Sequence, residues 1–81
     1  MNIAFYQPAI ARMLRLSRSI GYDSNDLFEA WALMAHDLVG KGVENAHDLA
    51  ADIVEATALS VARNGLPVDD VFRWICLVAS G

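Results

Sequence analysis

Two His-Asp pairs are the residues of this sequence best suited to chemistry, and each lies within a tetrapeptide AHDL. The pairs are His36-Asp37 and His47-Asp48, and they contain both histidines of the 81-residue chain. Neutral imidazole and carboxylate suit zinc, iron or manganese as ligands. Adjacent residues on a helix, however, point about 100° apart and cannot easily share one ion. We therefore expect each histidine to meet helix-end backbone groups or solvent, and we predict no metal and no cofactor.

Enzymatic chemistry has little support elsewhere in the sequence. The pairs resemble those of HD-type phosphohydrolases, but such domains need further His and Asp ligands on several helices, and this chain has two histidines only. The single cysteine, Cys76, has apolar sequence neighbours and is expected to be structural. No Gly-rich phosphate loop is recognisable. We predict a protein without enzymatic activity or small-molecule substrate, and a His-Asp metal enzyme is the least favoured function.

The segment 61–75 (VARNGLPVDDVFRWI) resembles a helix-turn-helix, which makes a DNA-binding regulator the alternative function. Two features depart from that family. Gly65 follows Ala62 by three residues where the family has four, and the would-be recognition helix opens with Asp69-Asp70. A recognition helix must approach phosphates, and carboxylates are repelled there. We therefore do not expect nucleic acid as a partner.

Charge is unevenly distributed along the sequence. The net charge is −4, yet three arginines and no acidic residue precede Asp23. Arg12, Arg15 and Arg18 form a candidate basic face. Polybasic membrane anchoring typically uses about 4–8 charges, and no apolar run of about 18 residues could span a bilayer. We predict a cytoplasmic protein with no membrane partner, whose basic face is solvated or paired with nearby acids.

Hydrophobic periodicity, interrupted by Gly and Pro turns, predicts an all-α fold. We expect a single domain over residues 1–81, formed by a compact bundle of four helices with antiparallel neighbours. Residues 2–7, before Pro8, are expected to be extended. The predicted helices cover about residues 8–20, 25–40, 45–64 and 68–80.

Each predicted helix has an apolar face, and the third is apolar nearly all round, so we expect it to be central. The side chains assigned to the core are Ile10, Met13, Leu14, Ser17 and Ile20 in the first helix; Leu27, Trp31, Met34 and Leu38 in the second; Ala46, Leu49, Ala50, Ile53, Val54, Thr57, Ser60 and Val61 in the third; and Val71, Trp74, Ile75 and Val78 in the last.

The third helix also holds apolar residues that one bundle does not need. Ala51, Ala58 and Ala62 form a second, flat ridge, and Leu59 interrupts the polar strip. Apolar residues make up 56% of the chain before Gly is counted, against roughly 45–50% with Gly included in a typical domain. We therefore expect a homodimer in which this Ala ridge or Leu59 meets a second copy.

The leading function is a small acidic protein–protein interaction module that acts as an adaptor, regulator or inhibitor. Its partner would be a second copy of the chain, a larger protein, or both. Three leucines interrupt the polar sides of successive helices, and acidic residues flank one of them. The candidate interaction surface consists of Leu33, Leu59, Leu77, Asp52 and Glu55.

Overall fold

Short turns divide the chain into four helices in the computed structural model, which describes residues 7–80. The described part contains no strand, so the predicted all-helical bundle is confirmed. Most of the predicted extended segment, residues 2–6, lies outside the described residues, and residue 7 already belongs to the first helix. The helices are α1 Gln7–Ile20, α2 Ser24–Gly40, α3 Ala46–Arg63 and α4 Asp69–Ser80.

Residues of the expected types form the helix ends. Asp23 caps α2 by accepting a 2.8 Å hydrogen bond from the backbone N–H of Asn25. Gly65 follows α3 with φ 68°, a left-handed conformation that costs glycine little, and its N–H donates to the carbonyl of Ala62. Pro67 then precedes α4. Local turn chemistry of this kind is what makes the boundaries readable from sequence.

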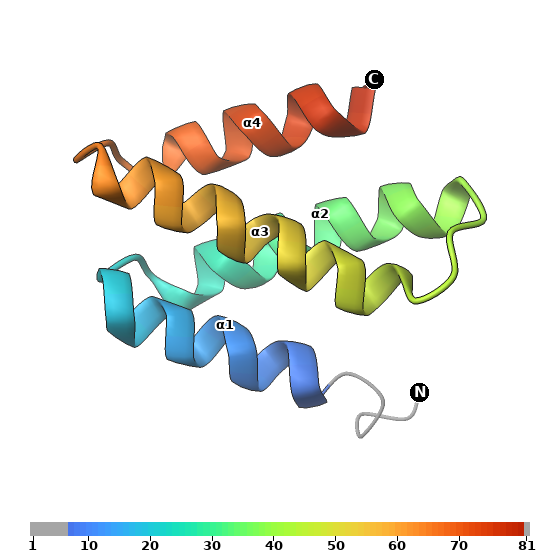
Figure 1. The fold of residues 1–81 in the computed structure, drawn as a ribbon, viewed down its shortest axis with the longest axis horizontal. Helices are drawn as coiled ribbons and strands as arrows, with labels where there is room; N and C mark the ends of the chain where they lie inside the picture. The colour runs from blue at the N-terminus through green and yellow to red at the C-terminus, as the bar shows by residue number, and fades with distance from the viewer. Residues whose placement is uncertain (1–6, 81) are drawn as a thin grey trace.

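The helices form a thin slab in which α1 and α4 lie on either side of α3, and α2 crosses behind them (Figure 1). Helices α2 and α3 each contact all the others, whereas α1 and α4 do not touch. The slab measures 34 × 29 × 15 Å between Cα atoms. Its thickness corresponds to two helix layers, because packed axes lie about 8–10 Å apart and each Cα cylinder has a radius of about 2.3 Å.

The expected Ala ridge of α3 lies inside the bundle. Ala51 and Ala58 are fully buried, at 0% exposure, and Ala62 is half-buried. The prediction that this ridge forms a second, outward surface is therefore wrong. Neighbouring helices cover a wider arc of α3 than the large side chains alone indicated, since small side chains let backbones approach closely.

The buried face of α1 is rotated from its predicted position. Ala9, Met13 and Leu16 are buried, while Leu14, which was assigned to the core, is exposed. On the same helix, Arg12 points towards α3, where it meets two carboxylates. Leu49 on α3 and Ser60 are likewise exposed rather than buried.

Two side-chain hydrogen bonds connect parts of the chain that are distant in sequence. The hydroxyl of Tyr22 donates to the carbonyl of Leu66 across 2.6 Å, which joins the first turn to the last. The indole N–H of Trp31 donates to the carbonyl of His47 across 2.9 Å, which joins α2 to the start of α3. Partial burial, with a smaller contribution from Asp70, raises the pKa of Tyr22 above its usual value.

Enlarging a buried alanine is expected to destabilise the bundle. Ala58→Leu should lower the free energy of unfolding by about 1–3 kcal/mol, because a fully packed site cannot accept three further carbons without displacing its neighbours. Urea denaturation followed by circular dichroism measures the change. Ala32→Leu, at an exposed position on α2, is the matched control and should stay within about 0.5 kcal/mol of wild type. Equal stability of both variants would contradict the burial of Ala58.

Candidate functional site

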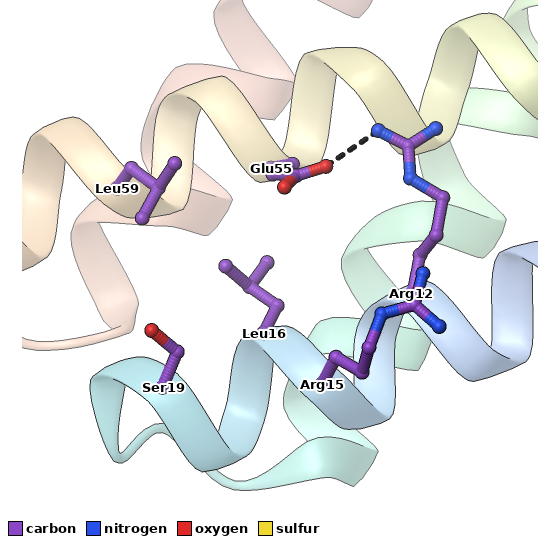
Figure 2. Close-up of a pocket in the computed structure, with 6 residues that line it drawn as sticks. All are labelled: Arg12, Arg15, Leu16, Ser19, Glu55 and Leu59. Atoms are coloured by element: carbon purple, nitrogen blue, oxygen red, sulfur yellow. Dashed lines mark hydrogen bonds and ion pairs between the residues drawn. The ribbon is translucent and has the colours of Figure 1, made fainter.

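One residue of the candidate basic face, Arg12, meets both candidate acidic residues between α1 and α3. Arg12 Nη1 lies 2.8 Å from Asp52 Oδ1, and its Nη2 donates a hydrogen bond to Glu55 Oε2 (Figure 2). Asp52 and Glu55 are three residues apart, so they share one side of α3. The guanidinium is therefore held by two carboxylates at once, and residues expected to face a partner instead join two helices of the same chain.

The charged state of Arg12 is favoured by this arrangement. The hydrogen bond to Glu55 is the largest cause of the raised pKa of Arg12, and together with a smaller contribution from Asp52 it outweighs the opposing effect of partial burial. The Arg12 side chain is 28% exposed and Asp52 63% exposed, so solvent screens the attraction. Pairs of this exposure contribute about 0–1 kcal/mol each. They therefore add to a contact between α1 and α3 in which Met13 and Leu16 are already buried.

A groove of about 330 Å³ runs beside this ion pair. Leu16 from α1 and Leu59 from α3 point towards one another across it, with Ser19 at one end (Figure 2). Leu59 is half-buried and packs against the core. It therefore lines a groove within one chain and does not project as an isolated apolar knob. Arg15 also lines this groove, and like Arg18 it is exposed and outside the ion pairs found within residues 7–80.

A second groove, of about 340 Å³, lies on the other side of α3. Trp74 and Val78 of α4 form one wall, and they are 55% and 47% exposed. Both were assigned to the core, and both assignments are wrong. The residues that line this groove from α3 are Ala56, Thr57 and Ser60, which are small or half-buried, and Val61, which is buried.

The exposure of Trp74 follows from the position of α4 at one side of the slab. Val71 and Ile75 are its only fully buried residues, and they face α2 and α3 between them. Trp74 and Val78 come next around the helix, and the small α3 side chains opposite do not fill the space. One sequence signal indicated this surface. Trp74, Leu77 and Val78 make the apolar arc of α4 wider than packing against a single neighbouring helix requires.

The remaining candidate leucines lie on other helices and line neither groove. Leu33 of α2 is 45% exposed, and Leu77 of α4 is 58% exposed. Leu77 is adjacent to Val78 and three residues from Trp74, so it extends the apolar face of α4. The five candidate residues therefore do not form one patch: Asp52, Glu55 and Leu59 lie on α3, and the two exposed leucines on α2 and α4.

The two histidines lie near one another in the fold, on a shallower hollow between α2 and the start of α3. His36 and His47 line it together with Trp31, whose ring centroid is 5.8 Å from that of His47. Across residues 7–80, no group of three or more His, Cys, Asp or Glu side chains is close enough to hold a metal ion. Cys76 is exposed, although its apolar sequence neighbours led us to expect a structural cysteine.

None of the four helices is both long enough and apolar enough to cross a membrane. On the described surface, two grooves flank α3: one is bordered by charged side chains, and the other by exposed apolar side chains. Neither the models of protein families, nor curated proteins, nor solved structures match this chain.

Removing the guanidinium of Arg12 tests its role in positioning α1. Arg12→Met keeps an apolar stem but leaves Asp52 and Glu55 without their shared cation, so we expect a loss of about 1 kcal/mol of unfolding free energy. Chemical denaturation at low and high salt measures it, and the difference from wild type should shrink in high salt. Arg18→Met is the control and should have little effect at either salt concentration. A salt-independent loss would show that Arg12 acts through packing alone.

Proposed function

We propose that this protein is a non-enzymatic protein–protein interaction module, and that the groove between α3 and α4 is its contact surface. The observation that carries the proposal is the exposure of Trp74 beside Val78 and Leu77. An adaptor, regulator or inhibitor of a larger protein or complex would act by presenting this surface. The acidic body, with net charge −4, would favour a partner with basic residues around its contact site.

Energetics support this surface over the one expected from sequence. Tryptophan is among the residues that contribute most to protein–protein binding, because a large ring removes much apolar area from water at small entropic cost. Trp74, Leu77 and Val78 are spaced as the anchors of a helix face that enters a partner's groove. Leu59, in contrast, has already lost much of its exposed area within the chain.

The DNA-binding alternative is less well supported. Asp69 and Asp70 occupy the first turn of α4, where a recognition helix would need to approach phosphates. Arg73, which lies nearby, is paired with Asp70 at 3.4 Å. The cytoplasmic location expected from the sequence stays a prediction.

Substituting the exposed tryptophan tests the proposed surface. Trp74→Ser should abolish capture of a specific partner from the native host, since loss of a central aromatic contact typically costs 2 kcal/mol or more of binding energy. Affinity capture with mass spectrometry identifies the partner, and the untagged chain itself counts as one. Leu33→Ser, at a similarly exposed apolar position on α2, is the matched control and should keep that partner. Circular dichroism of both variants confirms that they are folded.

The proposal fails if the partners captured by wild type are retained by Trp74→Ser and lost by Leu33→Ser. That outcome would move the contact surface to α2. Retention of the same partners by both variants would place binding outside both apolar sites.

A further inference from the structure

We propose that the occupant of the α3–α4 groove is a second copy of this chain, packed with its α3 antiparallel to the first about a two-fold axis. The contact would use the outward face of α3, defined by the exposed residues Asp52, Ala56, Ser60 and Arg63, together with Trp74 and Val78 of α4. This inference rests on the proposed interaction function and names its partner.

Charge complementarity along α3 determines the antiparallel direction. The N-terminal half of the outward side carries Asp48 and Asp52, and the C-terminal end carries Arg63. Within residues 7–80, neither Asp48 nor Arg63 forms an ion pair, and Asp52, although paired with Arg12, has a side chain that is still 63% exposed. Antiparallel packing places the arginine of each copy near the acidic half of the other, whereas parallel packing would place like charges together. A two-fold axis satisfies both ends at once, because the same surface serves in each copy.

The middle of the outward face is small enough for two helices to approach closely. Ala56 and Ser60 are exposed and one turn apart, so a two-fold axis between them places Ala56 of one copy against Ser60 of the other. Two residues that are equally distant from position 58, one on each side of it, then lie opposite one another in the two copies. Arg63 is five residues from that position and Asp52 six, which corresponds to about 8–9 Å along the helix. The arginine of one copy is therefore level with Asp52 of the other.

The same axis brings the apolar walls of α4 together. Rotation about an in-plane axis perpendicular to α3 leaves α4 on the same side of α3 in both copies, so the two α4 helices face one another across the interface. The groove places Trp74 and Val78 beside the segment 56–61 of α3. Trp74 of one copy consequently lies opposite Val78 of the other. The α3–α4 groove of each copy is therefore filled by the side chains that border the same groove in the other copy.

The available area fits a stable dimer. A typical specific interface buries about 800 Å² on each partner. The broad side of the slab measures 34 × 29 Å between Cα atoms, and α3 runs through its middle with α4 beside it. An interface of ordinary size can therefore form on this side without contribution from the opposite layer, where α2 lies (Figure 1).

Sedimentation equilibrium over a range of concentrations tests the dimer. Wild type should associate reversibly to twice its 8.8 kDa mass. Trp74→Ser should raise the dissociation constant at least about tenfold by removing an aromatic anchor. Arg63→Glu should raise it by about tenfold, since it sets like charges opposite one another. Arg18→Glu reverses an exposed arginine of α1 that lies outside the proposed interface, and it should leave the dissociation constant unchanged.

A charge exchange makes the test specific to the antiparallel register. The double variant Asp52→Arg/Arg63→Asp should recover most of the affinity that Arg63→Asp alone loses, because opposite charges again lie across the axis. Arg12 keeps Glu55 as a partner in that variant, and circular dichroism checks that it is folded. Absence of rescue in a folded double variant would overturn the proposed register.

Failure of the dimer is distinguishable from failure of the interaction function. A strict monomer at high micromolar concentration that still captures another protein through Trp74 overturns the second copy as occupant and leaves the function standing. A strict monomer without any Trp74-dependent partner overturns both. A dimer whose dissociation constant is unchanged by Trp74→Ser and by Arg63→Glu forms through another face, and this result too overturns the inference.

Discussion

The close contact between α2 and α3 is the interaction on which the rest of the structure depends. Alanines with no exposed surface lie on both helices, among them Ala30, Ala50, Ala51 and Ala58. Small side chains bring two helix backbones together, so this pair forms a thin centre with room for one further helix on each side. Helices α1 and α4 occupy those sides without touching each other. The slab shape, the outward face of α3 and the two flanking grooves all follow from this packing.

The outer helices are then fixed by different kinds of contact. Arg12 binds two carboxylates of α3, and on the same helix Leu16 is buried while Leu14 is exposed. α4 has no comparable ion pair to α3 in the described chain, and it is held mainly by Val71 and Ile75. A helix held through two fully buried residues has a narrow buried stripe, and its larger neighbours Trp74 and Val78 stay on the surface.

The positions of the four helices could be predicted because they depend on local chemistry. Asp23 and Gly65 act within one or two turns of themselves, so their effect is written in the sequence around them. The faces of the helices depend on the neighbours that cover them. Alanine fits either environment, which left Ala51 and Ala58 undetermined, and a tryptophan at a core spacing need not be buried. For the same reason, Asp52 and Glu55 could not be predicted as the partners of Arg12, because no local pattern relates residues some forty positions apart.

The surplus of apolar residues is therefore real, but it lies elsewhere than the alanines suggested. The core is filled by small side chains, while the bulky Trp74, Leu77 and Val78 remain in contact with water. A chain of this length buries only about 60–65% of its unfolded surface, so its stability as a monomer is modest. Any partner that binds the folded form adds to that stability, and the gain grows with the logarithm of the partner's concentration over the dissociation constant. Covering the groove would thus remove the exposed Trp74 ring from water and strengthen a fold whose own core is thin, and association would then be coupled to folding.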